Sequence, residues 1–358
     1  MSDQIRYPCC DNVNFDESDN RQTTQIDGLN RRQFVQAVGA SAAAACIATP
    51  AFAKDDAKSK SEALVKKLYD SLSEEQREEI CFDWEYSDDR GLLRTHVSNN
   101  WNITDAKLNV GGNFFTKDQQ DIIEAIFWGL YSPEWKDKIR KQLKDDAGGY
   151  GKRQSIAIFG EPGSDQFEFV MTGRHLTIRC DGNSADHVAF GGPIFYGHAA
   201  QGFNEKADHP GNVFWEQGLK ANALYKMLDG KQQKLALLER QPRESAVAFQ
   251  GKKSELPGIP VSELSSDQKE HMQKVLGSLL APYRVSDRED AMQCLKKQGG
   301  LDACSIAFYQ RGDIGNDQVW DNWRLEGPSF VWYFRGAPHV HVWVNVADSA
   351  IVKLNARG

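Results

Sequence analysis

Four histidines stand at positions where a protein could build a metal site. His339 and His341 lie two residues apart in Gly-Ala-Pro-His-Val-His-Val-Trp, a segment with the alternation of a β-strand. Residues i and i+2 of a strand point to the same face, so both imidazoles could bind one metal ion at about 2.0–2.1 Å, the usual Zn–N distance. His175 opens a strand-like segment after a Gly-Arg turn, and His198 ends another one. We expect these four histidines to be ligands of a transition metal, for which zinc, copper and iron all suit imidazole.

A second interpretation of the His-x-His pair remains open, because such pairs also occur as partly buried or surface side chains without a metal. The two interpretations differ in one geometric respect. A shared site requires imidazoles from distant parts of the chain to meet in one crevice, whereas a separation beyond about 8 Å would exclude shared coordination.

Aromatic residues and two arginines surround these histidines in the sequence. One interpretation of the aromatic residues is ordinary packing of the core. The other is a cleft that holds a small molecule with an anionic or carbonyl group, because apolar walls with a few polar groups are typical of ligand sites. Under the second interpretation, the candidate ligand-binding residues are Arg174, Tyr196, Trp332 and Arg335.

Several common chemistries are excluded by missing motifs. The chain has no C-x-x-C-H, which excludes covalent c-type haem, and no H-E-x-x-H or G-x-S-x-G, the signatures of common zinc proteases and α/β-hydrolases. The segment Phe-Gly-Gly-Pro at 190–193 is followed by no Lys-Ser/Thr and no predicted helix, so we expect no nucleotide cofactor.

Charge and composition exclude further classes of function. The 358 residues include 43 Lys and Arg against 50 Asp and Glu, a net charge of −7, so no basic excess is present to neutralise nucleic-acid phosphates. Hydrophobic residues make up 40% and charged residues 26% of the chain, as in ordinary globular proteins. No apolar run approaches the roughly 20 residues of a membrane-spanning helix.

The first 53 residues have the three parts of an export signal. Paired arginines in Arg31-Arg32-Gln33-Phe34-Val35 precede an Ala-rich apolar stretch at 37–47, and Ala51-Phe52-Ala53 resembles a cleavage site. The paired arginines are typical of a twin-arginine signal. We therefore expect residues 1–53 to be removed after contact with the twin-arginine export machinery. The mature protein, residues 54–358, would be a single α+β domain in the periplasm or elsewhere outside the cytoplasm, in a bacterial cell envelope.

Cysteine usage leaves the redox state of the mature chain open. Cys294 and Cys304 flank a turn-like Lys-Lys-Gln-Gly-Gly segment and are the best candidates for a disulfide outside the cytoplasm. The alternative is a pair of unpaired buried thiols.

Local patterns predict helices and strands in separate groups. Four segments read apolar, Ser/Thr/Asp, two further residues, Gln, which is a capping box at a helix start. They predict helices at about 73–81, 116–131, 229–240 and 265–281. Short alternating segments bounded by Gly, Pro or Asp predict two clusters of strands at 153–198 and 303–347. Helices and strands grouped in this way indicate an α+β fold, with antiparallel sheets against which the short capped helices pack.

These motifs together resemble a bacterial family, the domain of unknown function 3500. The resemblance covers most of residues 65–345 and is strongest in Gly173-Arg174-His175-Leu176 and Pro193-Ile194-Phe195-Tyr196-Gly197. The family usually has Gly-His-His-Leu at the first motif, so Arg174 departs from its pattern, whereas His339 and His341 fit its terminal histidine pair. The resemblance implies secretion and a shared scaffold, and it implies no activity.

Two functional hypotheses follow from the sequence. The leading hypothesis is an exported metal-dependent enzyme with a histidine-lined site on antiparallel strands, in which the metal acts as a Lewis acid or a redox centre. The alternative is a non-enzymatic protein that binds a small molecule in an aromatic and arginine-lined cleft. No motif identifies a reaction.

Overall fold

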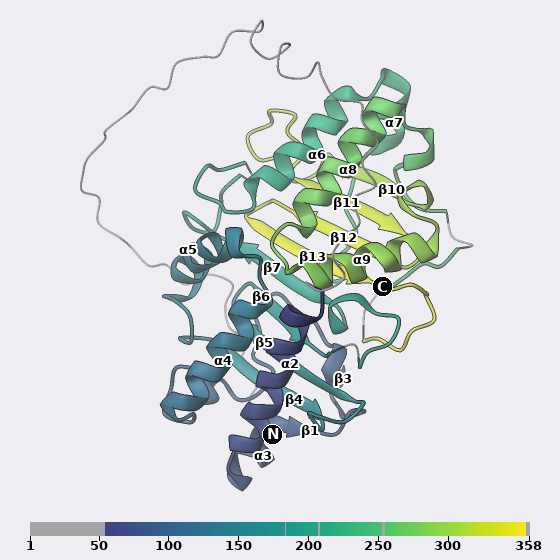
Figure 1. Ribbon diagram of the computed structural model, residues 1–358. Helices are drawn as coiled ribbons and strands as arrows, with labels where there is room; N and C mark the ends of the chain where they lie inside the picture. Colours follow the sequence, from purple (N-terminus) through teal and green to yellow (C-terminus); the bar gives the residue numbers. More distant parts are fainter. Residues whose placement is uncertain (1–53, 183, 207, 253–254, 356–358) are drawn as a thin grey trace, which may run out of the picture. The chain divides into compact units, whose positions relative to one another are not determined.

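The computed structural model describes residues 54–182, 184–206, 208–252 and 255–355. The predicted export signal lies outside these residues. The chain from Lys54 onwards forms one compact unit built around a single large sheet (Figure 1). The α+β class predicted from the sequence is confirmed.

The first half of this unit runs from helix α2 to strand β7. Its helices are α2 (Lys54–Ser71), α3 (Glu74–Ile80), α4 (Lys117–Gly129) and α5 (Lys136–Ala147). Its strands in the main sheet are β1 (Cys81–Phe82), β4 (Ser155–Gly160), β5 (Phe167–Gly173), β6 (Leu176–Cys180) and β7 (Ile194–His198). Strands β2 (Ser87–Asp88) and β3 (Gly91–Leu92) form a separate two-stranded ribbon.

The second half runs from helix α6 to strand β13. Its helices are α6 (Trp215–Met227), α7 (Gly230–Ala236), α8 (Ser266–Leu280) and α9 (Val285–Gln298). Its strands are β8 (Leu237–Leu238), β9 (Ile259–Pro260), β10 (Ser305–Tyr309), β11 (Asn322–Gly327), β12 (Phe330–Arg335) and β13 (Val340–Val346). The four capping boxes predicted from the sequence begin α3, α4, α7 and α8.

The two halves repeat the same order of elements. In each half a capped short helix leads directly into a two-residue strand that pairs in parallel with the first long strand, β1 with β4 and β8 with β10. Two further helices precede a run of four antiparallel strands, β4 to β7 or β10 to β13. The strand order β1-β4-β5-β6-β7-β13-β12-β11-β10-β8 therefore has equivalent strands at equal distances from its centre. We conclude that the fold consists of two similar halves related by an approximate two-fold axis.

Two contacts lie at the seam between the halves. Strands β7 and β13 pair antiparallel in the middle of the sheet, with Tyr196 opposite Val342. Behind them Tyr131, which follows α4, and Tyr283, which follows α8, form a β-bridge, and their rings stack with centroids 6.2 Å apart. The seam therefore joins equivalent parts of the two halves.

The two faces of the sheet have different coverings. Helices lie over one face, where α2 lies beside α4 and α6 beside α8 (Figure 1). The large hydrophobic core lies between these helices and strand residues such as Leu176, Tyr196, Trp332 and Val342. The opposite face, which includes Phe195, Tyr333 and Trp343, packs against residues of irregular segments such as Val97 and Val247. Because loops carry binding and catalytic residues more often than helices and strands do, the loop-covered face is the natural place for a site.

The four described cysteines are free thiols, so the structure does not form the predicted Cys294–Cys304 disulfide. Burial raises the pKa of the Cys304 thiol to about 12 and that of Cys294 to about 11. Both therefore behave as small buried side chains.

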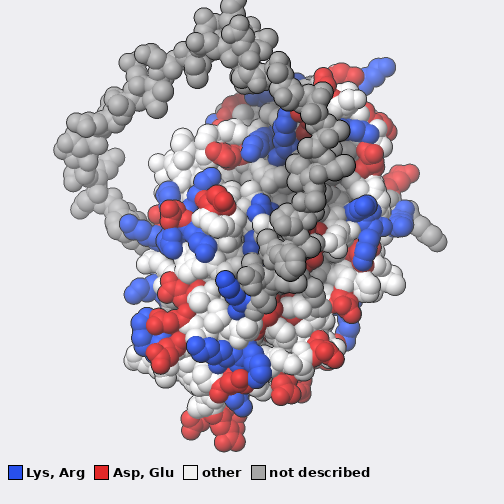
Figure 2. Space-filling model, viewed as in Figure 1, with Lys and Arg blue, Asp and Glu red and all other residues white. Residues whose placement is uncertain are grey.

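The surface agrees with the acidic composition. Figure 2 shows basic and acidic side chains intermixed over the helix-covered face, with acidic groups concentrated at the end where α3, of sequence Glu-Glu-Gln-Arg-Glu-Glu-Ile, lies. Among the described helices, none combines the length and apolar character needed to cross a membrane.

Candidate metal centre

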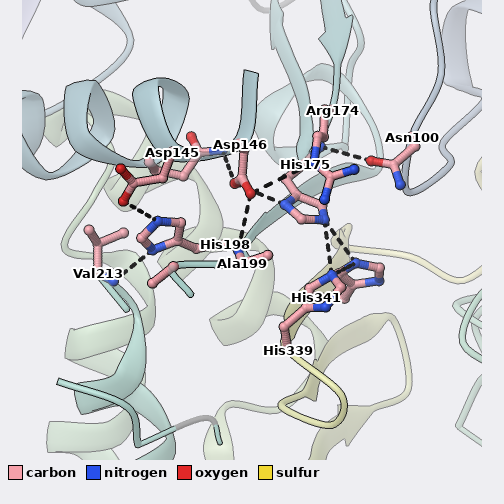
Figure 3. Close-up of polar contacts among 12 residues, drawn as sticks. Asn100, Asp145, Asp146, Arg174, His175, His198, Ala199, Val213, His339 and His341 are labelled. Atoms are coloured by element: carbon pink, nitrogen blue, oxygen red, sulfur yellow. Dashed lines mark hydrogen bonds and ion pairs between the residues drawn. The ribbon is translucent and has the colours of Figure 1, made fainter. Parts of the chain in front are cut away.

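Three histidines from distant parts of the chain meet with their Nε2 atoms together (Figure 3). The Nε2 atoms of His339 and His341 are 3.0 Å apart, and that of His175 lies 3.0 Å from His341 and 3.2 Å from His339. Each residue is 1% exposed. The sequence prediction that imidazoles converge in one place is therefore correct for these three.

Strand geometry brings the three rings to one side of the sheet. His341 belongs to β13, and His339 immediately precedes it, so both side chains point to the loop-covered face, as the two-residue period requires. His341 lies opposite Gly197 of β7. A Cβ atom at Gly197 would stand 3.3 Å from Cγ of His175, so the missing side chain makes room for that ring.

His175 reaches the cluster from a tight turn between β5 and β6. Its φ of 54° is in the left-handed region, which non-glycine residues rarely adopt. The backbone N–H of His175 donates to the carbonyl of Asn99 and to Oδ1 of Asn100, both at 3.3 Å, which holds the strained turn in place. Strain of this kind is common where a side chain must be aimed at a functional site.

Each ring has an acceptor at its other nitrogen. Nδ1 of His339 donates to the carbonyl oxygen of Phe203 at 2.9 Å. Nδ1 of His341 contacts Oε1 of Glu244, which also accepts from the indole N–H of Trp343 at 3.1 Å. Nδ1 of His175 lies 2.9 Å from Oδ2 of Asp146, although this carboxylate lies off the direction of the ring N–H. These acceptors favour the tautomer with the proton on Nδ1 and the lone pair on Nε2.

The surroundings keep His339 and His341 neutral. Burial, together with the nearby His175 and Arg335, lowers the pKa of His339 to about 4. Burial and the same neighbours hold the pKa of His341 well below its usual range. Burial opposes ionisation of Asp146, but His175, His198 and Gln142 outweigh it and lower the pKa of its carboxyl to about 2.

The resulting arrangement fits a metal ion. Three Nε2 lone pairs directed at one point repel each other unless a cation lies among them. In a tetrahedral site with Zn–N distances of 2.0–2.1 Å, the nitrogens stand about 3.3 Å apart, close to the observed 3.0–3.2 Å. A carboxylate or carbonyl behind each ligand is the usual way that proteins orient metal-binding histidines.

The fourth predicted ligand, His198, does not join the cluster. It lies opposite Val340 in the β7–β13 pair, so its side chain points to the helix-covered face. Its Nδ1 accepts from the N–H of Val213 at 3.1 Å, and its Nε2 donates to Oδ2 of Asp145 at 3.0 Å (Figure 3). Both ring nitrogens are therefore used in hydrogen bonds away from the other three histidines.

The four candidate ligand-binding residues are divided between the two faces. Tyr196 and Trp332 lie in the helix-side core, where the Trp332 indole donates to the Tyr196 hydroxyl at 3.0 Å and that hydroxyl donates to Gln217 at 2.9 Å. Arg174 and Arg335 lie beside the histidine cluster, with side chains 24% and 15% exposed. The structure thus brings the two arginines together with the histidines and places the two aromatic residues elsewhere.

Three residues of the site were not identified from the sequence. Asp146 lies in the last turn of α5, two residues before Gly148, Glu244 lies in an irregular segment, and Phe203 contributes its backbone carbonyl to His339. None stands in a motif or a periodic pattern. If the sequence had been used to predict that β12 and β13 pair as a hairpin, Arg335 could have been placed opposite His341. That pairing gives no information about Glu244.

Comparison with known proteins gives a family and no activity. Residues 54–345 match a family described as protein of unknown function (DUF3500). No curated protein and no solved structure matches the chain. Since the match spans the whole sheet up to Asn345 of β13 and includes all three clustered histidines, the chain belongs to this DUF3500 family.

Proposed function

We propose that this protein is a metal-dependent enzyme whose centre is formed by His175, His339 and His341. The single observation that carries the proposal is the meeting of three buried Nε2 atoms within 3.2 Å, each on a ring with an acceptor behind its Nδ1. A structural zinc site normally has four protein ligands, whereas three protein ligands leave a position for water or substrate. Three ligands therefore favour catalysis over a purely structural role.

Zinc is the metal that the donor set favours. All three donors are neutral imidazole nitrogens, as in zinc enzymes that keep one open position. Iron oxygenases of the common type use two histidines and one carboxylate, and the carboxylates here lie behind the rings. A zinc ion in this environment supplies Lewis acidity and lowers the pKa of a bound water to about 7. The protein holds the ligands, keeps His339 and His341 neutral and excludes bulk water from the far sides of the rings.

The alternative hypothesis, a ligand-binding protein without catalysis, has less support. It relied on an aromatic cleft that included Tyr196 and Trp332. Both side chains are buried in the core, 6% and 0% exposed, and are satisfied by hydrogen bonds to each other and to Gln217.

We also propose that the enzyme acts outside the cytoplasm. The support is the sequence of residues 31–53, in which paired arginines, an Ala-rich stretch and an Ala-Phe-Ala site occur in the order of a twin-arginine signal. Export of a fusion protein, compared with the same fusion carrying Arg31→Lys and Arg32→Lys, tests this part. Loss of export in the double variant supports it, and unchanged export contradicts it.

The metal centre is tested by elemental analysis of the purified protein and of matched histidine variants. We expect about one metal ion per chain in the wild type. His339→Ala and His341→Ala each remove a ligand and are expected to lose the metal. His198→Ala and His271→Ala are expected to retain it, because His198 faces Asp145 and His271 bonds to the Lys220 carbonyl.

Circular dichroism of each variant separates loss of metal from loss of fold. Hydrolysis of a panel of esters, amides and phosphate esters by the zinc-loaded protein then tests for catalysis. A folded wild-type protein that neither contains a transition metal nor gains thermal stability from added Zn²⁺ would overturn the proposal.

A further inference from the structure

Two arginines each lie beside a carboxylate that faces a metal ligand. Nε of Arg174 lies 3.8 Å from Oδ1 of Asp146, whose other oxygen faces His175. Nη1 of Arg335 lies 3.5 Å from Oε2 of Glu244, whose other oxygen faces His341. The site thus contains two series of side-chain contacts, each running from a guanidinium through a carboxylate to an imidazole.

The charges in these two series of contacts cancel. Asp146 and Glu244 contribute two negative charges, Arg174 and Arg335 two positive charges, and the third ligand, His339, is held by an uncharged carbonyl. With neutral imidazoles, the protein therefore leaves the charge of a divalent cation uncompensated. In a buried site of low dielectric, an uncompensated cation strongly favours an anion at its open position.

Both arginines also lie next to a metal ligand, one across the sheet and one along the chain. Arg335 lies opposite His341 in the β12–β13 pair, and Arg174 directly precedes His175. The side chains of both arginines are partly exposed, whereas the three ligands are buried. At 3.8 Å, the contact of Arg174 with Asp146 is longer than a hydrogen bond and does not use its N–H donors.

An exposed aromatic ring, that of Phe203, lies beside His339. Phe203 is 42% exposed, and its ring centroid is 5.7 Å from that of His339. Its carbonyl oxygen orients His339, so the position of its ring is tied to the position of a metal ligand. An exposed phenyl ring beside a buried polar centre is suited to contact the apolar body of a ligand.

On the basis of the proposed metal centre, we infer that the substrate is an organic carboxylate with an apolar body. Its carboxylate lies between the metal position and the guanidinium of Arg174, with Arg335 adding positive charge, and its apolar body contacts Phe203. Guanidinium groups suit this role because their N–H donors match the two oxygens of a carboxylate. The inference deepens the proposed function and depends on it.

The test uses the protein loaded with Co²⁺, whose visible absorption reports ligands at the open position. Benzoate, acetate and the uncharged benzamide are titrated into the wild type and into Arg174→Gln, Phe203→Ala and Arg140→Gln. Arg140 is a matched control, since it lies on α5 and pairs with Asp137 on the exposed side of that helix. Metal content is measured for every variant.

We expect benzoate to bind at least about tenfold more tightly than benzamide to the wild type, as for a charge-assisted contact. Arg174→Gln should weaken benzoate about tenfold at unchanged metal content, and Phe203→Ala should reduce benzoate to the affinity of acetate. Arg140→Gln should behave as the wild type. If Arg174→Gln fails to fold, Arg335→Gln takes its place in the test. This variant is also expected to lower the affinity for benzoate.

Two results would contradict the inference in different ways. Equal affinities for benzoate and benzamide, or unchanged benzoate affinity in a metal-loaded Arg174→Gln variant, would overturn the carboxylate inference and leave the metal centre standing. Failure of the folded wild type to bind any metal would overturn the metal centre itself, and the carboxylate inference with it.

Discussion

At the scale of single residues, neutral buried histidines make the stability of the proposed metal centre depend on pH. The pKa of His339 is lowered to about 4, chiefly by burial, whereas an unfolded chain has the ordinary histidine value of about 6.5. Below pH 6.5 the unfolded chain therefore binds a proton that the folded state excludes until the pH approaches 4. The contribution of neutral His339 to the free energy of unfolding is fully present above this pH range and decreases as the pH falls through it.

The corresponding prediction concerns the metal-free protein. Between pH 7 and pH 5, His339 alone should lower the free energy of unfolding by about 2 kcal/mol, since each pKa unit corresponds to about 1.4 kcal/mol. Urea unfolding of the chelator-treated protein at a series of pH values measures this change. His339→Gln, which has no titrating group, should show a smaller decrease, and a decrease equal to that of the wild type would refute the assignment.

At the scale of elements, the sequence predicted the segments whose signals are local. The helices found in advance, α3, α4, α7 and α8, each begin with a capping box, whereas α5, α6 and α9 begin with Trp135, Phe214 and Arg284, which make no side-chain cap. Strands β4 to β7 and β10 to β13 were predicted from alternation and turn residues. What alternation cannot supply is which strands pair and in what register.

The same limit explains the outcome at the site. His339 and His341 could be assigned to one face from their spacing alone. Whether His198 shares that face depends on its pairing opposite Val340, which no local pattern shows. Asp146 and Glu244 reach the histidines from a helix end and a loop, through contacts that only the folded chain creates.

A pair of glycine substitutions tests the role of the β7–β13 pairing. In Gly197→Ala, the new Cβ would collide with the Val340 carbonyl and stand 3.3 Å from the His175 ring. We expect a loss of about 2–3 kcal/mol in stability and reduced metal content, as for overpacking in a buried site. Gly277→Ala in α8 is the matched control, because its Cβ meets no atom within 4 Å. It should raise stability by up to about 1 kcal/mol, the difference in helix propensity.

Thermal unfolding and elemental analysis of both variants give the result. Normal metal content in a folded Gly197→Ala protein would show that the close approach of β7 to His175 is not required for the centre.

At the scale of the whole molecule, the cluster of His175, His339 and His341 connects the two halves of a repeated fold. His175 belongs to the first half, and His339 and His341 belong to the second. His175 directly precedes β6, and the equivalent corner of the sheet in the second half is the position directly before β12. No histidine stands at that position. Ser329 stands there, and its backbone N–H donates to Gln298 at the end of α9. The duplication thus supplies two similar frames, of which one carries the cluster.

This arrangement predicts that the metal stabilises the contact between the halves. A ligand that binds only the folded state at a thousandfold excess over its Kd adds about 4 kcal/mol to stability, and removing the metal should lower the Tm by about 5–10 °C. Because one ligand comes from the first half and two come from the second, His175→Ala and His341→Ala should each abolish the effect of a chelator on the Tm. Ser329→Ala, at the equivalent corner, should retain it. When the metal is removed, hydrogen exchange should show the largest loss of protection in β7 and β13, where the halves pair. A loss confined to α3 or α7, at the outer edges of the sheet, would place the stabilising effect of the metal elsewhere.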